Sequence, residues 1–475
     1  MAHRVGRNEW TRFRGEGEHV NRQAALAAGF AAHEITPAGP VAQSGFVART
    51  AKSVGVHDPL YARAAVLADG PDRAALLVLD VIGVDADLTR EIRAAVAATA
   101  GVPAERIAVL ATHTHGAPAV LRRSQLGEVS PAYLQWVVEG AAAAASAAAD
   151  RLEACEVRHA RGQQAEVARN RRDPAGATNP AVDVLRFDAG GRCLGLLVSY
   201  ACHPVVLGAD NLLITRDYPG YVVDALEEAV PGAVALFATG CAGQLNTGHR
   251  AHDSWSAAAA PRRTFAEAER IGGLITAAAL GAARDASAGA PLPYAPLRVA
   301  SEHVRVALAP DPTPTASWAA ELAAELAADD VPPERRAVLE AYLNWAEAAG
   351  DAEAVLELEL QAFAICGRAL AIYPGEAFVE YGLRLERRFP GRVTALAYGN
   401  NAPGYLPTRA AHTEGGYEVQ EAHRFYGQPG PVAPEAEDTL IEAMARLVER
   451  VLGGTAEPGA APRAAPASAE EGAAS

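Results

Sequence analysis

Short apolar runs that alternate with helical patterns are the feature that most constrains how this chain can fold. Ala75–Ile82 is an apolar run suited to a buried strand, and a helical pattern follows it over Asp87–Ala98. A second apolar run covers Ile107–Thr112. Strand, helix and strand in this order are typical of a βαβ unit, in which a helix connects two parallel strands across one face of the sheet.

The same alternation continues in the next part of the chain. Ser130 followed by Pro131 is a typical helix start, because serine caps the first turn and proline is favoured at the first helical position. Apolar runs at Leu194–Tyr200 and Ala233–Ala238 predict two more strands, and the pattern near Tyr218–Ala229 predicts a helix between them.

The C-terminal half predicts some antiparallel pairing. Gln361–Cys366 and Arg368–Tyr373 are separated by Gly367, which predicts a hairpin, and a helix is expected from Glu376. The predicted fold class is therefore α/β, with mixed β-sheets and βαβ units flanked by helices. The last expected elements are a strand at Val393–Tyr398 and a helix over about Pro434–Leu452.

The length of 475 residues allows one large catalytic domain, which we place at residues 26–452. Residues 1–25 are expected to form a polar N-terminal extension. Residues 453–475 have the Pro, Ala, Gly and Glu bias of a disordered tail, which cannot bury enough apolar surface to order itself. The segment at about 314–359 is rich in alanine and glutamate and predicts a helical insertion.

The charge and the apolar pattern exclude several classes of partner. A net charge of −15 repels the phosphate backbone, so nucleic acid is not expected to bind. No apolar run approaches the roughly 18 residues of a transmembrane helix, and the charged N-terminal segment lacks the apolar stretch of a secretory signal. We therefore expect a cytoplasmic protein without a membrane span, of undetermined oligomeric state. The five cysteines show no CxxC spacing, so no thiolate metal site is expected.

Two histidines directly follow the strand expected at Ile107–Thr112. If the two-residue period of a strand continues, His113 and His115 point to the same side. Two imidazoles on one side can share a metal ion, or one can bind the metal while the other serves the substrate. A pair of hydrogen-bonded structural histidines is the alternative for this motif taken alone.

Other candidate residues follow other strands and turns, and each has an ordinary structural explanation. His203 follows a strand, but a lone histidine is more often structural than a ligand. Glu376 suits the first turn of a helix, where the helix dipole favours a carboxylate, and Tyr405 lies in a loop of turn formers where packing would explain it. Arg171 belongs to a charge run. Asn246 ends a glycine-rich segment that no Gly-Lys-Ser/Thr follows, so it is not a phosphate loop.

Taken in order and spacing, these motifs resemble the catalytic domain of the neutral/alkaline (non-lysosomal) ceramidase family, without its C-terminal immunoglobulin-like domain. The resemblance spans roughly Gly29 to Gly453. The family's chemistry is zinc-dependent hydrolysis of the amide bond between a fatty acyl group and a sphingoid base. The motifs that carry the resemblance are Ile35-Thr36-Pro37, Ser44-Gly45-Phe46, Thr112-His113-Thr114-His115, Cys202-His203-Pro204, Pro374-Gly375-Glu376 and the Asn401–Tyr405 loop.

The resemblance implies one zinc ion (Zn²⁺) per chain and assigns roles to individual residues. The metal positions of the family fall on His113, His203, Glu376 and Tyr405, and His115 falls beside the scissile group. The remaining correspondences are Arg171 for an arginine of the pocket, Gly45 for a glycine at its floor and Asp217 for an aspartate after the second zinc histidine.

One position departs from the family. Characterised ceramidases carry a serine where this chain has Asn246. An amide is not a nucleophile, although it can hold a water or polarise a carbonyl, so the attack would fall to zinc-bound water. His115 would then act as general acid or base, with Arg171 and Asn246 stabilising the oxyanion or fixing the polar end of the substrate.

The expected function is zinc-dependent hydrolysis of an amide bond in an N-acyl amine, either ceramide-like or smaller. The missing serine and the missing export signal favour a non-sphingoid N-acyl amine, a small amide or an ester over ceramide as the substrate. The alternative from another class is a non-catalytic descendant that uses the pocket to bind a ligand. A long apolar groove above the metal would favour lipid amides, whereas a small polar cup would not.

Overall fold

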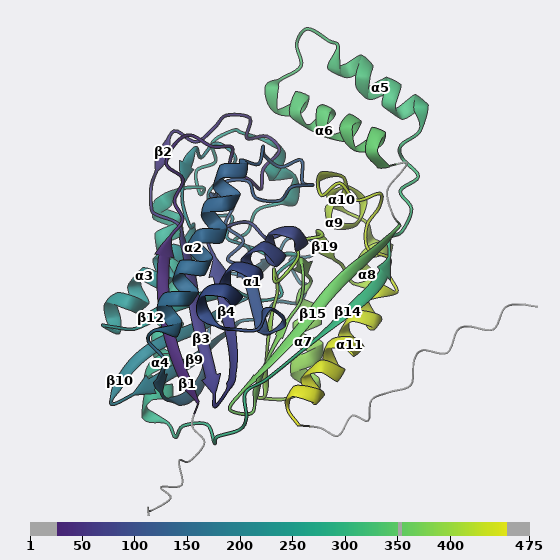
Figure 1. The fold of residues 1–475 in the computed structure, drawn as a ribbon. Helices are drawn as coiled ribbons and strands as arrows, with labels where there is room; N and C mark the ends of the chain where they lie inside the picture. The colour runs from purple at the N-terminus through teal and green to yellow at the C-terminus, as the bar shows by residue number, and fades with distance from the viewer. Residues whose placement is uncertain (1–25, 350–353, 454–475) are drawn as a thin grey trace, which may run out of the picture.

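The computed structural model describes residues 26–349 and 354–453. The polar extension expected at residues 1–25 lies outside the described residues, as does the tail expected at 453–475 except for Gly453. In the described ranges no helix is both long and apolar enough to cross a bilayer. The chain forms mixed sheets with helices packed on their outer faces, which confirms the predicted α/β class (Figure 1).

The first sheet has five strands in the order β5-β4-β3-β1-β6. Its β4 and β5 are parallel and are joined through helix α1, which confirms the predicted βαβ unit. Helix α2 starts after Ser130, whose side chain accepts a hydrogen bond from Tyr133 N, and packs across β1 and β3. The bounds are β1 Ala27–Glu34, β3 Tyr61–Asp69, β4 Asp72–Leu79, α1 Ala86–Ala100, 3₁₀ helix η1 Ala104–Arg106, β5 Ile107–Ala111, α2 Pro131–Ala149 and β6 Glu153–Ala154.

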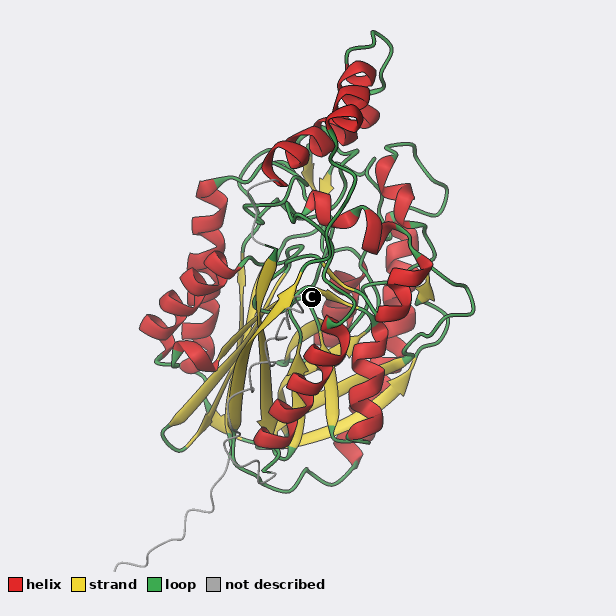
Figure 2. Cartoon of the chain, turned by 90° about the vertical axis from the view of Figure 1, so that its right-hand side faces the viewer, coloured by secondary structure: helices red, strands yellow, loops and turns green. Residues whose placement is uncertain are grey.

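The second sheet has the order β12-β10-β9-β7, with β10 and β12 parallel on either side of helix α3 in the chain. Helix α3 spans Tyr218–Ala229, as predicted, and helix α4 covers β7 and β9. Figure 2 shows the strands lying between layers of helices. The bounds are β7 Glu156–Gln163, β9 Ala181–Ala189, β10 Arg192–Tyr200, β12 Val234–Thr239 and α4 Phe265–Ala288.

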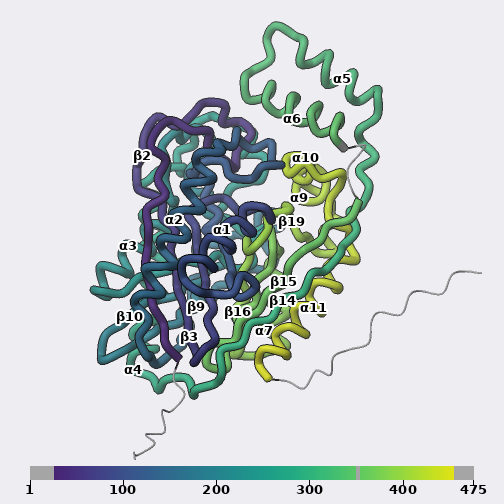
Figure 3. The backbone as a smooth tube through the Cα atoms, viewed as in Figure 1, coloured from purple at the N-terminus to yellow at the C-terminus, as the bar shows by residue number. Residues whose placement is uncertain are grey.

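The third sheet, in the order β14-β15-β16-β18, contains the predicted hairpin. Strands β15 and β16 pair antiparallel, and both residues of the turn, Cys366 and Gly367, have positive φ. Helix α11 packs along β14 and β15, and Figure 3 shows these segments side by side although they are far apart in the sequence. The bounds are β14 Arg298–Ala307, β15 Val355–Ile365, β16 Arg368–Ile372, α7 Val379–Arg388, β18 Val393–Leu396 and α11 Ala436–Val451.

Two predicted boundaries are wrong. The helix expected from Glu376 begins at Val379, because Glu376 belongs to a two-residue strand that pairs with a distant segment. The insertion expected to be helical over 314–359 contains α5 (Ala316–Leu326) and α6 (Pro333–Ala349), but its last residues, 355–359, form the start of β15. In both cases long-range pairing in a sheet overrides the local pattern.

The apolar core lies between the sheets. Phe30 of the first sheet packs against Phe187 of the second, with ring centroids 5.1 Å apart. Gly195 of β10 leaves the space for this contact, because a Cβ there would lie 2.4 Å from Phe30 Cδ1. Buried residues of the third sheet, including Phe363, join the same cluster.

Short strand pairs near the ends of the main strands bring distant segments together. Strand β8 (Arg169–Asn170) pairs with β13 (Leu245–Asn246), and β17 (Glu376–Ala377) pairs in parallel with β19 (Tyr405–Leu406). These pairs position the side chains of the site described next. The remaining elements are β2 Gly55–Val56, β11 Leu213–Ile214, 3₁₀ helix η2 Ala251–Trp255, α8 Arg409–Glu414, α9 Tyr417–Gln420 and α10 Ala422–Phe425.

Candidate metal centre and active site

Three histidines converge beyond the ends of β5 and β10. A ring nitrogen of each of His113, His115 and His203 lies within 4.8 Å of the other two. His113 and His115 do point to one place, but the reason differs from the prediction. Strand β5 ends at Ala111, and His113 has a left-handed backbone with φ 69°, so a turn and not the strand pleat aims the two rings.

Backbone carbonyls fix the orientation of two of these rings. His113 Nδ1 donates a hydrogen bond to Ile82 O (2.5 Å), and His203 Nδ1 lies 2.7 Å from Ala242 O and 3.0 Å from Leu245 O. Because a carbonyl only accepts, the hydrogen of each ring sits on Nδ1. In the neutral ring each Nε2 then offers a lone pair toward the centre of the group, which is the arrangement of metal-binding histidines.

Glu376 is buried against these lone pairs. Its Oε2 lies 2.8 Å from His203 Nε2 and 3.5 Å from His113 Nε2, and its Oε1 accepts a hydrogen bond from the hydroxyl of Tyr426. Burial acts to raise the pKa of Glu376, but its interactions with His113 and His203 outweigh burial and hold the pKa well below the usual value. The carboxylate is thus ionised and can serve as a ligand.

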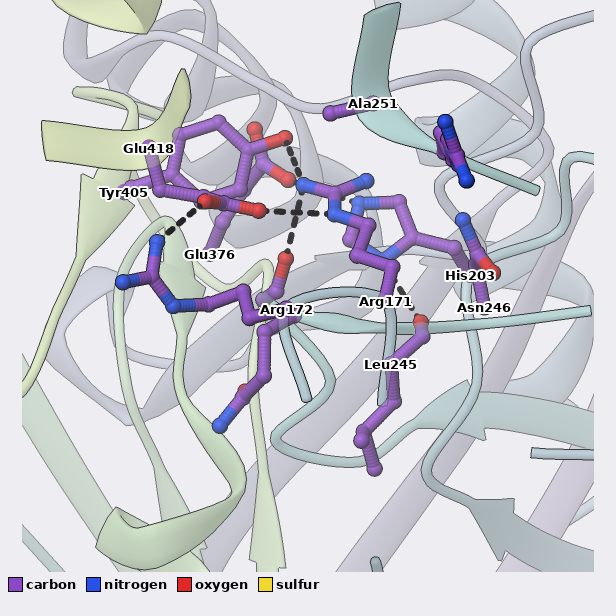
Figure 4. Close-up of polar contacts among 12 residues, drawn as sticks. Arg171, Arg172, His203, Leu245, Asn246, Ala251, Glu376, Tyr405 and Glu418 are labelled. Carbon is purple, nitrogen blue, oxygen red and sulfur yellow. Dashed lines mark hydrogen bonds and ion pairs between the residues drawn. The ribbon is translucent and has the colours of Figure 1, made fainter. Parts of the chain in front are cut away.

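Tyr405 lies directly opposite Glu376 in the β17–β19 pair. Its hydroxyl accepts a hydrogen bond from Arg171 Nη2 (2.9 Å), and Arg171 Nε donates to Glu418 Oε1 (2.7 Å), as Figure 4 shows. Burial raises the pKa of Tyr405, whereas the charge of Arg171 acts to lower it. Arg171 is placed here by the β8–β13 pair, just after Asn170.

His115 forms part of the wall next to the metal-binding nitrogens. Its Nε2 lies 3.4 Å from His113 Nε2, and among the residues described its Nδ1 has no hydrogen-bond partner. Burial, together with the neighbouring His113 and His203, lowers the pKa of His115 well below 6.5, so its imidazole is neutral. Gly45, with φ 99°, gives the ring its space, because a Cβ there would lie 2.3 Å from His115 Nδ1.

Asn246 lines the pocket, and its amide also forms hydrogen bonds with the backbone of its own loop. Its Oδ1 accepts hydrogen bonds from the backbone N–H groups of Gly248 and His249, and its Nδ2 donates to His249 O (2.7 Å). An amide nitrogen carries two hydrogens, so one remains for another partner.

Asp217 serves the backbone and does not line the pocket. Its carboxylate accepts hydrogen bonds from Tyr218 N (2.7 Å) at the start of α3 and from Leu207 N (3.0 Å). Burial raises the pKa of Asp217 to about 6.

Sequence reasoning missed two partners of the site. Glu418 binds both Arg171 and Arg172, and the hydroxyl of Tyr426 holds Glu376. Arginines in a charge run are ordinarily solvated, so nothing in the sequence indicated a buried carboxylate about 250 residues away.

These side chains surround a small cup with a volume of about 40 Å³. The cup has room for a few water molecules, so in the described conformation it is not a long groove. Its lining residues are Gly45, Phe46, Ile82, His115, Leu126, Arg171, Val205, Asn246, Arg250, Ala251, Ser254, Arg263, Glu376, Tyr405, Tyr417 and Tyr426.

The donor set fits a metal ion. His203 Nε2 and Glu376 Oε2 lie 2.8 Å apart, and a contact this short is favourable only with a cation between the two atoms, either a proton on Nε2 or a metal ion. Imidazole and carboxylate donors are those that zinc prefers. The three-histidine group can therefore hold a metal ion.

The chain is similar to known proteins in both sequence and structure. The family profile described as neutral/alkaline non-lysosomal ceramidase, N-terminal, matches residues 27–241. That range contains His113, His115 and His203, whereas Glu376 and Tyr405 lie beyond it. No curated protein matches the sequence.

Two solved structures share the fold. The neutral ceramidase from Pseudomonas aeruginosa superposes with a TM-score of 0.69 at 20% identity, covering 93% of this chain and 77% of that one. A structure described as ceramidase complexed with C2 gives a TM-score of 0.69 at 19% identity, with the same coverage. Residues 27–241 therefore belong to the neutral/alkaline non-lysosomal ceramidase family, as its N-terminal domain, which confirms the resemblance inferred from the sequence.

Proposed function

We propose that this protein hydrolyses the amide bond of an N-acyl amine at a single zinc ion. The observation that carries the proposal is the convergence of His203 Nε2 (2.8 Å) and His113 Nε2 (3.5 Å) on one buried carboxylate oxygen, Glu376 Oε2. Membership of the ceramidase family supports an amide as the bond that is cleaved. The ligands in this proposal are His113, His203, Glu376 and Tyr405.

When bound, zinc would polarise the substrate carbonyl and lower the pKa of a water molecule toward about 7. The protein would prepare this chemistry in two ways. The Nδ1 bonds of His113 and His203 keep their Nε2 lone pairs free for the metal. The Arg171 guanidinium donates to the oxygen of Tyr405, which favours the ionised, metal-binding form of the phenol.

His115 is the general acid and base in this proposal. Its neutral imidazole would accept a proton from the attacking water and deliver it to the leaving amine. The lowered pKa of His115 keeps it in the accepting form before reaction, and its unpartnered Nδ1 lies in the pocket wall beside Gly45.

Arg171 and Asn246 would hold the carbonyl oxygen as negative charge develops on it. Arg171 lines the pocket with a charge already balanced by Glu418, and Asn246 keeps one free amide hydrogen. Donors that are fixed before reaction stabilise the developing oxyanion without having to reorganise.

The lining of the cup, which combines arginines and Asn246 with aromatic rings, supports a small polar N-acyl amine over ceramide as the substrate. A panel of N-acyl amines with varied acyl chains and head groups, tested beside ceramide and matched esters, separates these substrates. Turnover of short amides is expected. Ester turnover without amide turnover would instead favour an esterase, and metal binding without any turnover would favour a ligand-binding descendant.

Metal content tests the centre itself. The purified protein is expected to carry about one zinc per chain by mass spectrometry of the metal, and His113→Ala, His203→Ala is expected to lose it. A matched control replaces two exposed histidines, His252 and His303, by alanine and should keep the metal. No zinc in the unmodified protein, or equal zinc in the two double variants, would refute the proposal.

A further inference from the structure

Two arginines at the rim of the cup form no ion pair with the residues that the structure describes. Arg250 and Arg263 both line the pocket, on the segment between β13 and α4. Among the described residues, no carboxylate oxygen lies within 4.0 Å of either guanidinium. Arg263 is partly buried, so its charge is removed from water without being paired.

The other charges of the pocket are balanced. Arg171 pairs with Glu418 at 2.7 Å. The one acidic residue among those that line the cup, Glu376, is directed at the histidines. Arg250 and Arg263 therefore leave a surplus of positive charge at the cup, although the whole protein carries a net charge of −15.

Arg263 is held in a defined place. Its guanidinium carbon lies 5.7 Å from the centre of the Phe46 ring. The Phe46 ring also contacts the His115 ring, with the two centroids 4.8 Å apart. Gly208 makes room for the arginine, because a Cβ there would lie 2.9 Å from Arg263 Cδ. One aromatic ring thus links the guanidinium to the proposed catalytic imidazole.

The nearest acidic residues form no ion pair with Arg263 within 4.0 Å in the described part of the chain. Asp217 caps α3, and Asp253 accepts a hydrogen bond from the backbone N–H of Arg250 (2.9 Å). Asp210 lies close to the guanidinium, because a Cβ at Gly208 would meet both Asp210 Oδ1 (2.5 Å) and Arg263 Nη1 (3.0 Å). Burial lowers the pKa of Arg263 although Asp253, Asp210 and Asp217 act in the opposite direction. Among the described residues the Arg263 guanidinium donates no hydrogen bond, so its donors are available at the rim of the substrate pocket.

We propose that Arg263, assisted by Arg250, binds a carboxylate group of the substrate, so that the substrate is an amide with a carboxylate a few bonds from its scissile C–N bond. The planar guanidinium matches a carboxylate with two parallel hydrogen bonds. This inference rests on the proposed amidase function and names its substrate class.

Two kinds of amide share this chemistry: an N-acyl amino acid, with the carboxylate on the amine side, and the mono-amide of a dicarboxylic acid, with the carboxylate on the acyl side. In either case water adds across the C–N bond, which breaks as the new C–O bond forms. The products are a carboxylic acid and an amine.

The test uses a ligand that cannot be hydrolysed. In 4-oxononanoic acid a methylene replaces the amide nitrogen of hexanoylglycine, and the same compound also mimics N-butylsuccinamate. Its neutral carboxamide serves as the uncharged partner. Binding of both to the purified full-length protein is measured by calorimetry, so the result does not depend on turnover and stays separate from a failure of the amidase proposal.

The acid is expected to bind at least about tenfold more tightly than the carboxamide, as for a charge-assisted hydrogen bond. Arg263→Gln should abolish this preference, and Arg263→Lys, which keeps the charge but loses the planar fork, should retain part of it. The matched control is Arg262→Gln, because Arg262 lines a different cavity and should leave the preference intact.

Equal binding of acid and carboxamide by the unmodified protein would overturn the inference. So would an undiminished preference in an Arg263→Gln variant whose thermal unfolding is unchanged. Turnover of hexanoylglycine against N-butylsuccinamate then assigns the carboxylate to the amine side or the acyl side, and hydrolysis of neutral amides in preference to both would contradict the assignment.

Discussion

Single atoms of the main chain decide the chemistry of the histidine group. The carbonyls of Ile82 and Ala242 each take the Nδ1 hydrogen of a histidine, so that His113 and His203 present only lone pairs to the centre. His115 has no such partner among the described residues. This difference supports the proposed roles, in which His113 and His203 bind the metal and His115 transfers the proton.

The lowered pKa of His115 predicts the pH dependence of the reaction. The active form is the neutral imidazole, and both burial and the neighbouring histidines disfavour its protonation. As the pH falls, activity is therefore expected to persist through 6.5, the ordinary histidine pKa, and to decline only below it. The measurement is kcat/KM for the best amide between about pH 5 and 8. An acidic limb with its midpoint at or above 6.5 would contradict the assignment.

Gly45→Ala is predicted to disable His115 without removing the metal. The new Cβ would lie 2.3 Å from His115 Nδ1, at a backbone φ of 99° that alanine rarely adopts. Displacing the ring by about 1 Å is expected to lower kcat/KM on the order of a hundredfold. Zinc content should stay unchanged, because His113 and His203 are untouched.

The control for this variant is Gly39→Ala. Gly39 lies in the same N-terminal region, and a Cβ there would meet nothing within 4 Å. Activity comparable to that of the unmodified protein is expected from it. If Gly45→Ala retains full activity, His115 is not held by the contact described.

At the scale of secondary-structure elements, the sequence predicted those helices and strands that the local apolar pattern determines. The alternation of strand and helix around β4, α1 and β5 follows from the apolar periodicity, and α3 was predicted at its observed bounds. The start of α7 was predicted wrongly because the β17–β19 pair depends on a segment about 30 residues away. Long-range pairs of two residues leave no periodic signal in the sequence.

The same limit applies to the site. The sequence predicted four metal ligands because each follows a strand or turn in a family pattern: His113, His203, Glu376 and Tyr405. Glu418 was not predicted, because the sequence does not show which distant carboxylate pairs with an arginine. Arg250 and Arg263 were not predicted either, because an unpaired arginine cannot be told from a solvated one in the sequence.

Gly195→Ala is predicted to destabilise the contact between the first two sheets. The added Cβ would lie 2.4 Å from Phe30 Cδ1, in a core where Phe30 is also packed on Phe187. Overpacking of this kind typically costs about 1–3 kcal/mol. The free energy of unfolding in urea measures the cost, and a double-mutant cycle with Phe30→Leu should show that the two substitutions are coupled.

A matched glycine distinguishes this effect from helix or strand propensity. Gly273 lies in α4, where a Cβ would meet nothing within 4 Å, so Gly273→Ala is expected to leave stability unchanged or to raise it slightly. A loss of stability in Gly273→Ala as large as in Gly195→Ala would mean that the close approach of Phe30 is not the cause.

On the scale of the whole molecule, the inserted helices α5 and α6 stand over α9 and α10 (Figures 1 and 3). Trp345 Nε1 donates to Gln428 O (2.6 Å), and Tyr342 donates to Glu421 (3.1 Å). Arg424 lies against the rings of Trp318, Tyr342 and Trp345. These contacts hold the segment 417–428, which supplies Tyr417, Glu418 and Tyr426 to the site.

The insertion is therefore predicted to keep the cup small. Trp345→Ala removes a fully buried ring and its hydrogen bond to Gln428, which should loosen segment 417–428 and admit longer acyl chains. The ratio of kcat/KM for a long-chain amide to that for a short-chain amide is expected to rise severalfold. Hydrogen exchange in peptides from this segment should increase in parallel.

The matched control is Trp136→Ala, because Trp136 is 43% exposed on α2 and does not line the cup. If the ratio stays unchanged in Trp345→Ala while hydrogen exchange increases, the walls formed by the other elements, and not the insertion, set the length of substrate that the site accepts.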